Sequence, residues 1–323
     1  MKTRRLGRTN LQVSEIGFGA WGIGKALWVG ADDADSLRAL HRAIDLGVNL
    51  IDTALAYGPG HSERLVGQLV RERPETIVVA TKVPPKNGRW PASPAVPVGE
   101  VFPGDHIVAS CESSLRNSGL EALDLLQLHV WHDAFLGEGD WLDAFDKLKR
   151  AGKLRFAGIS INDHAPASAL RAVASGIFDT VQVIYNIFDP TPAEELLPLC
   201  LKHDVGVLAR VPLDEGGLTG AITRESGFPA GDFRARYFRG DRKQQVFEHA
   251  KALERLLGEE AKSLAELALR FCLSHPAVST VIPGMRSVGN VERNAALSDG
   301  RQLSPRLLAQ LSQHAWPRNF YQP

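Results

Sequence analysis

Four polar side chains of this sequence stand at or just after the ends of short apolar runs, where they could act on one substrate. They are Asp52, Tyr57, Lys82 and His129. A charged aspartate and lysine at the ends of apolar strands are costly unless they pair. A lysine beside a tyrosine favours the phenolate and lowers the phenol pKa, so Tyr57 could act as a general acid near neutral pH. Any one of the four alone fits a solvated rim charge equally well, whereas all four together favour catalysis.

These residues can meet only if the runs that carry them are neighbouring parallel strands. Eight runs rich in Val, Ile and Leu occur near residues 15–19, 50–53, 76–82, 123–128, 154–159, 180–185, 206–211 and 278–283. Amphipathic stretches alternate with them at residues 35–46, 61–70, 105–115, 140–150, 165–175, 194–202, 243–257 and 288–297. Eight strand–helix units predict an α/β fold of the (β/α)8 TIM barrel type, whose strands end at one common rim.

Other segments add to this barrel. A hairpin of residues 3–6 and 12–13 precedes the first strand, and two extra helices are expected near the C-terminus, at 264–272 and 305–314. Long loops, 84–104 and 214–241, follow the third and seventh strands, on the face where barrel enzymes build active sites. Because no linker-like Ser/Gly tract divides the chain, we expect one domain over residues 1–323.

Composition excludes several classes of function. Lys and Arg number 37, as do Asp and Glu, and a chain of 323 residues with no net charge lacks the basic surface of a general nucleic-acid binder. No apolar run approaches the ~20 residues of a membrane span. The three cysteines are far apart, and the N-terminus has no apolar signal region. These features predict a cytoplasmic protein that binds neither nucleic acid nor membrane.

Three further patterns in the sequence could indicate a binding site. Gly17, Gly19 and Gly22 fit G-x-G-x-x-G, but no helix opens at the third glycine, so a barrel-mouth loop is favoured over a dinucleotide-binding turn. The histidines and aspartate of residues 129–133 lack a second ligand cluster, so no metal is expected. Trp21 and Trp131 are predicted to line an apolar substrate pocket, although aromatic residues are more often ordinary packing.

The signature of a known family overlaps the first two catalytic candidates. Residues 51–63 read IDTALAYGPGHSE, which resembles the aldo-keto reductase pattern D-T-A-x-x-Y-G-x-G-x-S-E. Residues 5–14 resemble that family's N-terminal hairpin and residues 281–286 its cofactor segment, so the likeness runs from about residue 3 to about residue 298. The resemblance implies NADPH-dependent reduction of an aldehyde, ketone or sugar carbonyl, or the reverse oxidation. It implies that Tyr57 protonates the carbonyl oxygen, Lys82 tunes Tyr57, Asp52 pairs with Lys82, and His129 orients the carbonyl.

The resemblance also assigns residues to NADP(H), from its nicotinamide to its adenine. They are Ser160, Asn162, Gln182, Arg210, Pro212, Leu213, Gly217, Gly284, Arg286, Asn290 and Asn294. Arg210 stands where the family usually stacks an aromatic ring on the nicotinamide, and a planar guanidinium can also stack. The alternative for Arg210 is an ion pair at the rim. Arg286 would bind the ribose 2′-phosphate, because its fork fits a phosphate and favours NADP over NAD.

Two other functions remain open on the sequence. A non-catalytic NADPH-binding regulatory subunit would bind the cofactor with negligible turnover. A metal-dependent barrel isomerase or hydrolase would lose activity on chelation and would bind no nucleotide. The intact set of Asp52, Tyr57, Lys82 and His129 favours the reductase over both.

Overall fold

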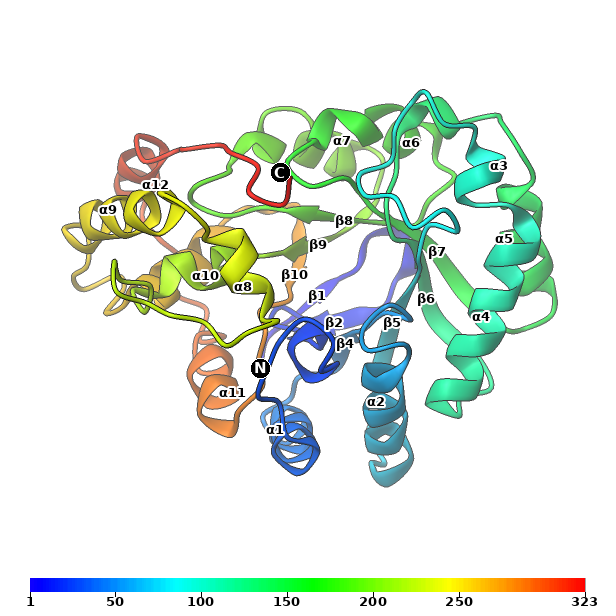
Figure 1. The fold of residues 1–323 in the computed structure, drawn as a ribbon, viewed down its shortest axis with the longest axis horizontal. Helices are drawn as coiled ribbons and strands as arrows, with labels where there is room; N and C mark the ends of the chain where they lie inside the picture. Colours follow the sequence, from blue (N-terminus) through cyan, green and yellow to red (C-terminus); the bar gives the residue numbers. More distant parts are fainter. Residues whose placement is uncertain (323) are drawn as a thin grey trace.

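The computed structural model describes residues 1–322, and its strands carry the predicted barrel (Figure 1). The strands are β1 Thr3–Arg5, β2 Gln12–Ser14, β3 Phe18–Gly19, β4 Leu50–Asp52, β5 Val78–Val83, β6 Leu123–Leu128, β7 Leu154–Ser160, β8 Thr180–Ile184, β9 Gly206–Arg210 and β10 Val278–Val281. β1 and β2 pair antiparallel as the expected hairpin. β3 to β10 pair in parallel, each with the next in sequence. Parallel bridges Ile16–Val281 and Gly19–Gly284 join the first strand to the last and close the barrel.

Helices surround the strands, as Figure 1 shows for α1, α2, α4 and α5. The helices are α1 Asp33–Asp45, α2 His61–Glu72, α3 Val98–Val101, α4 Gly104–Ser118, α5 Trp141–Arg150, α6 Leu170–Ser175, α7 Leu196–Lys202, α8 Phe233–Tyr237, α9 Arg242–Glu254, α10 Leu264–Leu273, α11 Val288–Ala295 and α12 Pro305–Ser312. Side-chain caps begin several of them: Ser263, Ser287 and Ser304 each accept a bond from a backbone N–H of the first turn. α10 and α12 confirm the two extra C-terminal helices.

The loops hold more structure than the sequence predicted. The stretch 84–104 contains α3, and the stretch 214–241 contains α8 and a 3-10 segment, Asp214–Thr219. The predicted helix 165–175 divides into a 3-10 turn at Pro166–Ala169 and the shorter α6. Proline begins that turn, because its ring fits a first helical position but supplies no N–H.

Of the three apolar clusters in the described residues, two stabilise the barrel itself, and the third packs α8 and α9 against the C-terminal tail. The larger lies between the strands and the surrounding helices. The smaller gathers Leu50, Ala80, Leu125 and Leu208 with Leu6 and Val13 of the hairpin. Side chains alternate between the faces of a strand, so this second cluster fills the barrel interior. The hairpin therefore plugs the amino-terminal end of the barrel and leaves its carboxyl-terminal end for chemistry.

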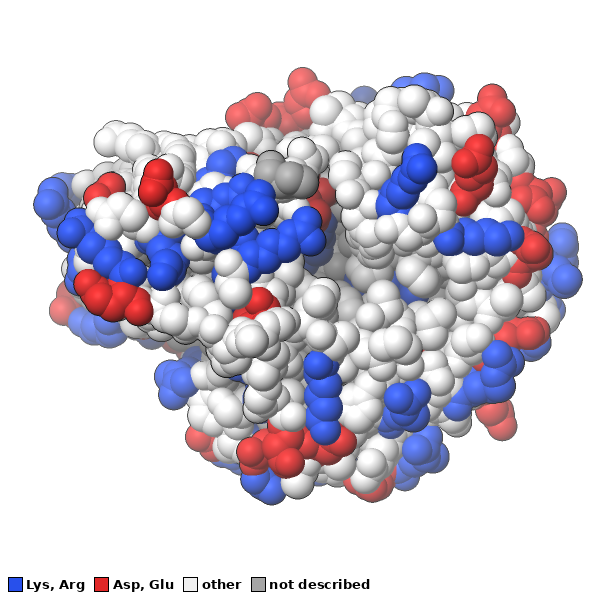
Figure 2. Space-filling view, viewed as in Figure 1, with Lys and Arg blue, Asp and Glu red and all other residues white. Residues whose placement is uncertain are grey.

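The C-terminal tail, residues 313–322, returns from α12 across the barrel towards β8 (red in Figure 1). On this face of the molecule, Lys and Arg side chains gather over α9 and the tail, beside a central hollow (Figure 2). Arg242 of α9 donates to the backbone oxygen of Phe320 at 2.8 Å, and Lys243 donates to that of Ser226. These basic residues thus tie loop, helix and tail together. No helix among residues 1–322 is long and apolar enough to cross a membrane.

Candidate active site

A polar layer lies directly above the apolar filling of the barrel. In β4 and β5, Leu50 and Ala80 belong to the interior cluster, and two residues further on stand Asp52 and Lys82. The same step leads from Leu125 to Gln127 and from Leu208 to Arg210. Because every second residue of a strand faces the same side, the ends of four strands supply polar groups to one interior layer.

Lys82 is the centre of this layer. Its side chain is 0% exposed, and its Nζ donates to Asp52 Oδ1 at 2.5 Å and to the backbone oxygen of Thr53 at 2.7 Å. A third bond runs from Nζ to the Tyr57 hydroxyl at 3.4 Å. All three donors of the ammonium group are therefore used, as a buried charge requires.

Asp52 is satisfied from the other side by two carboxamides. Its Oδ2 accepts from Gln182 Nε2 at 2.7 Å and from Gln127 Nε2 at 3.4 Å. Ser160 donates to Gln182 Oε1 at 3.4 Å. Ser160 and Gln182, both predicted to hold the nicotinamide amide, thus lie in the same layer as the Asp52–Lys82 ion pair. Gln182 also fixes the orientation of Asp52.

The residues after β4 bring Tyr57 back over Lys82. Ser62 accepts from Thr53 Oγ1 at 2.8 Å and donates to the backbone oxygen of Ala20 at 3.0 Å. Glu63 accepts from Thr81 Oγ1 at 2.6 Å, next to Lys82. The serine and glutamate of the signature therefore hold the strand ends together rather than contact a substrate.

Two glycines allow Tyr57 to sit deep in the rim. A Cβ on Gly58 would lie 1.8 Å from the backbone oxygen of Gly24, and a Cβ on Gly24 would lie 2.9 Å from the backbone of Tyr57. Neither glycine could be replaced without moving this backbone. In the same segment, a Cβ on Gly22 would lie 2.7 Å from Arg286 Cγ. The glycine run is thus a close-packed loop at the barrel mouth, as predicted.

The expected lowering of the Tyr57 pKa is not what this structure gives. Burial raises the pKa of Tyr57 well above its usual value, the negative charge of Asp52 raises it further, and Arg210 opposes the rise. Desolvation of the phenolate outweighs the attraction of the nearby cations. Tyr57 therefore keeps its proton through the neutral range. Its hydroxyl oxygen accepts from Lys82, and among residues 1–322 no acceptor faces its own proton.

His129 stands beside Tyr57, with ring centroids 5.8 Å apart and ring planes at 71°. Burial lowers the pKa of His129 well below its usual value, and the charges of Lys82 and Arg210 act in the same direction. The imidazole is therefore neutral at physiological pH. Its Nδ1 is buried and has no hydrogen-bond partner in the described part of the chain. A neutral histidine with a free ring nitrogen can form a hydrogen bond to a substrate oxygen.

The aromatic residues at the rim differ in part from the prediction. Trp21 does lie next to Tyr57, with ring centroids 6.1 Å apart. Trp131 does not: it is 0% exposed, packs against Trp141 and Phe178, and donates its Nε1 to a carboxylate within the core. The prediction that Trp131 lines a substrate pocket is wrong, because the chain turns inward after β6.

Trp90, not Trp131, is the tryptophan that lies beside His129. Its ring meets the His129 ring edge-on, with centroids 4.6 Å apart, and it is 48% exposed. Asn162 holds the loop that carries Trp90, since its Oδ1 accepts from the backbone N–H of Ala92 and its Nδ2 donates to the Ala92 oxygen, both at 2.9 Å. This differs from the prediction that Asn162 holds the nicotinamide amide, because Asn162 Oδ1 and Nδ2 already bind a buried backbone.

Arg210 forms the rim ion pair that the sequence left as an alternative. Its Nη2 bonds Asp163 Oδ1 at 2.8 Å and the backbone oxygen of Ile161 at 2.9 Å. Its Nε is buried and without a partner in residues 1–322. The guanidinium therefore has donors left over, and a stacked ring could still lie on its plane.

The residues predicted for the diphosphate and adenine lie on the loops around β9, β10 and α11. Pro212, Leu213 and Gly217 belong to the backbone segment that follows β9, and Gly217 packs so closely that a Cβ would lie 2.4 Å from Asp214 Oδ2. Gly284 is exposed after β10, with open space where a Cβ would be. On α11, Asn294 is buried, and Asn290 accepts from Arg293.

Arg286 is half-buried without an acid beside it. Its Nη1 donates to the backbone oxygen of Val29 at 3.1 Å, and its guanidinium lies 5.5 Å from the ring centre of Trp28. No carboxylate of residues 1–322 lies within ion-pair distance of Arg286. Buried atoms without partners also include Trp28 Nε1 nearby and His129 Nδ1 across the mouth. Unpartnered polar atoms and a free guanidinium at one rim suit a large anionic ligand such as NADP(H).

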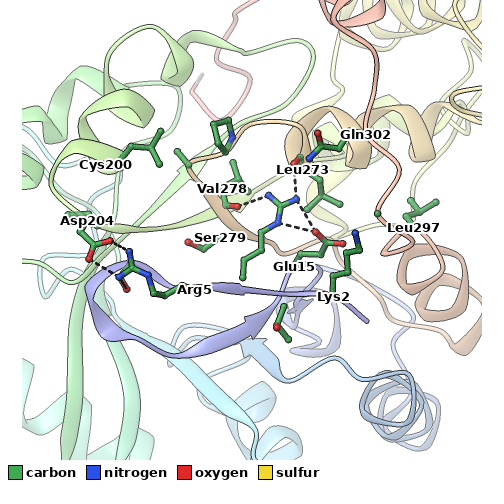
Figure 3. Close-up of a pocket in the computed structure, with 18 of the residues that line it drawn as sticks. Lys2, Arg5, Glu15, Cys200, Asp204, Leu273, Val278, Ser279, Leu297 and Gln302 are labelled. Carbon is green, nitrogen blue, oxygen red and sulfur yellow. Dashed lines mark hydrogen bonds and ion pairs between the residues drawn. The ribbon is translucent and has the colours of Figure 1, made fainter.

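A cavity of about 550 Å³ lies at the other end of the barrel (Figure 3). Its arginines are already paired. Arg4 bonds Glu15 and the backbone oxygens of Leu273 and Val278, and Arg5 bonds both oxygens of Asp204. This cavity faces the amino-terminal ends of the strands, so its charged groups stabilise the hairpin rather than await a ligand.

Two buried acids of this rim were not predicted from the sequence. Asp214 and Glu215 are buried in the segment after β9, and the tail residue Tyr321 donates its hydroxyl proton to Glu215. The only signal for them was an acid pair within an otherwise apolar and glycine-rich stretch. Their tail partners Arg318 and Tyr321 lie more than a hundred residues away, so no local pattern could reveal those contacts.

Comparison with known proteins completes this picture. The model of the aldo/keto reductase family matches residues 15–315. Aldo-keto reductase YhdN of Bacillus subtilis (strain 168) is 31% identical over 300 residues, 90% of this chain and 87% of that protein. The NADH-specific methylglyoxal reductase of Escherichia coli (strain K12) is 30% identical over 315 residues, 92% and 93% of the two chains. The structure of an aldo-keto reductase from Klebsiella pneumoniae in complex with NADPH has a TM-score of 0.71 at 28% identity and covers 98% of this chain and 96% of that one. With a closed barrel and the signature residues gathered at its carboxyl-terminal rim, the chain belongs to the aldo/keto reductase family.

Proposed function

We propose that this protein reduces the carbonyl group of a small aldehyde, ketone or sugar, or oxidises the corresponding alcohol, with NADP(H). One observation carries the proposal: the Tyr57 hydroxyl accepts from buried Lys82, so its own proton is left for a substrate. The four predicted catalytic residues contact one another in an unbroken chain from Asp52 through Lys82 and Tyr57 to His129. Three cysteines, all buried and free, support a cytoplasmic location.

When bound, NADP(H) supplies or accepts the hydride at the carbonyl carbon. Tyr57 donates its proton to the carbonyl oxygen as that oxygen gains negative charge. Lys82 then stabilises the phenolate that remains, because its ammonium group lies against the Tyr57 oxygen in a dry environment. Asp52 keeps Lys82 in place, and neutral His129 offers a ring nitrogen to the substrate oxygen.

Each part of NADP(H) would be held by a different set of residues at this rim. Ser160, Gln182 and Arg210 would hold the nicotinamide, and the backbone at Pro212, Leu213 and Gly217 would cover the diphosphate. Gly284 leaves room for the ribose, and Arg286 would bind its 2′-phosphate, because no carboxylate of residues 1–322 competes for the guanidinium. Asn290 and Asn294 would lie against the adenine. One relative is named NADH-specific, so membership of the family does not by itself fix the choice between NADPH and NADH. The proposed preference for NADPH depends on Arg286.

The substitution Tyr57→Phe tests the acid. We expect kcat for a panel of aldehydes, methylglyoxal among them, to fall by about 10²–10⁴-fold, while the affinity for NADPH, followed by its fluorescence, changes little. Tyr185→Phe is the matched control, since the Tyr185 ring packs on Phe271 in the outer core. Turnover by Tyr57→Phe at the wild-type rate would exclude Tyr57 as the acid. NADPH binding by the wild type without any turnover would favour the regulatory subunit instead.

A further inference from the structure

Two acidic side chains are buried where the proposed function puts a diphosphate. Asp214 is 0% exposed and Glu215 is 9% exposed, and both follow β9 directly within the segment of Pro212, Leu213 and Gly217. A buried negative charge there would repel an anionic cofactor. The segment can serve as a diphosphate site only if these two acids are neutralised.

The backbone of this segment also needs support. Val211, Asp214 and Glu215 have φ angles of 54°, 49° and 53°, a left-handed conformation that residues other than glycine rarely adopt. For a β-branched residue such as Val211 it is especially unfavourable. Backbone strain of this kind persists only where surrounding contacts determine the conformation.

The C-terminal tail and α8 supply partners for both acids, and Arg318 of the tail neutralises Asp214. Arg318 Nη2 pairs with Asp214 Oδ2 at 2.6 Å, and the Tyr237 hydroxyl of α8 donates to Asp214 Oδ1 at 3.1 Å. Tyr321 donates its hydroxyl proton to Glu215 Oε1. The tail makes a further bond, from Asn319 Nδ2 to the backbone oxygen of Asp163 at 3.1 Å, which fixes it to the loop that follows β7.

The tail is itself firmly packed. The Arg318 side chain is 9% exposed, and its guanidinium lies 4.1 Å from the ring centre of Trp316 and 5.0 Å from that of Phe188. Trp316 stacks on His249 of α9, with ring centroids 3.9 Å apart. Arg318 is therefore held over Asp214 by groups that have no other evident role at the rim.

Glu215 is neutral for part of the physiological pH range. Burial raises its pKa to about 7; Asp214 and Asp163 add to the rise, while the Tyr321 hydroxyl and Arg210 oppose it. Tyr57 and Tyr237 also lie within electrostatic reach of Glu215, and burial keeps both phenols protonated. Below about pH 7, Glu215 carries a proton and Asp214 is paired with Arg318.

We propose that residues 316–322 of the C-terminal tail are part of the cofactor site: Arg318 neutralises Asp214, and Arg318 and Tyr321 are positioning residues that hold the backbone at 212–217 ready for the diphosphate. This inference rests on the proposed function. Because ionised Glu215 would repel the diphosphate, we expect the dissociation constant for NADPH to rise as the pH increases through about 7.

The experiment measures NADPH dissociation constants by fluorescence from about pH 6 to about pH 9, for the full chain. Ionisation of Glu215 beside a diphosphate should weaken wild-type binding by about tenfold or more. Glu215→Gln keeps an acceptor for Tyr321 but cannot ionise, so it should bind at the higher pH as the wild type does at the lower. Arg318→Gln should weaken binding by about tenfold at every pH, because Asp214 loses its cation. Tyr185→Phe is the control.

Binding of adenosine 2′-phosphate, which lacks the diphosphate, shows whether the variants act through the diphosphate or through another part of the cofactor. A phosphate monoester itself titrates near pH 6, and this probe keeps that titration but lacks the diphosphate. We expect the tail and Glu215 variants to bind it as the wild type does. Equal loss of both ligands, or a Glu215→Gln profile identical to that of the wild type, would overturn the inference while leaving the proposed function intact. Failure of the wild type to bind NADPH at any pH would instead remove the proposed function, and the inference with it.

Discussion

The buried pair of Asp52 and Lys82 gives a prediction that can be made quantitative. The two side chains are 3% and 0% exposed, with Nζ and Oδ1 2.5 Å apart. Removing one partner of such a pair leaves the other charge unpaired in the interior, which costs about 3–5 kcal/mol. We therefore expect Asp52→Asn and Lys82→Met each to lower the free energy of unfolding by about that amount near neutral pH.

The double variant Asp52→Asn/Lys82→Met shows whether the two effects share one cause. It leaves no buried charge at this place, so its loss should be smaller than the summed losses of the single variants by about 2–3 kcal/mol. The pH dependence has a definite sign. Burial lowers the pKa of Lys82, and Asp52 opposes this. Without Asp52 the folded state prefers uncharged Lys82, so the deficit of Asp52→Asn should shrink as the pH rises towards the ordinary lysine pKa.

Denaturant unfolding of the four proteins at about pH 7 and about pH 9 provides the measurement, with constant m-values as the check on two-state behaviour. Lys86→Met is the matched control, since Lys86 and Asp105 form an exposed pair 3.8 Å apart and should contribute no more than about 1 kcal/mol. If either single variant loses no more than this control, or if the two losses simply add, the pair does not hold the polar layer as argued.

Two further substitutions test the assignments at the rim. Arg286→Ala should weaken NADPH by about 10–100-fold and NADH by less than about twofold in fluorescence titrations, because only NADPH carries the 2′-phosphate; equal losses would remove that assignment. Asn162→Ala should leave the N–H and oxygen of Ala92 buried without partners and weaken its loop by about 1–3 kcal/mol, seen as faster hydrogen exchange around Trp90; unchanged exchange would show that Asn162 does not hold the loop.

The residues that end strands could be placed from the sequence, and those in the loops could not. Parallel strands buried on both faces read as continuous apolar runs, so the positions of Asp52 and Lys82 at one rim followed from the pattern. Once a strand ends, its alternation gives no further direction. Trp131, two residues past His129, therefore turned into the core, while Trp90 reached the site from a proline-rich loop.

The sequence also could not predict how burial changes the pKa values of groups in the barrel interior. The attraction of Lys82 for the Tyr57 phenolate was correctly anticipated as a contact, but its effect on the pKa depends on burial, which a sequence does not give. In the same way, Glu215 reads as an ordinary loop acid until Tyr321 and the surrounding packing are known.

The site also depends on the end of the barrel that it does not face. Asp52 and Lys82 lie one alternation step above the apolar layer of Leu50 and Ala80, which the hairpin closes from below with Leu6. Water entering from the amino-terminal end would reach the Asp52–Lys82 ion pair and weaken the electrostatic interaction of Lys82 with Tyr57. Because the hairpin excludes water from that side, the Tyr57 proton can be given only towards the carboxyl-terminal rim, where the cofactor loops, Trp90 and the C-terminal tail converge.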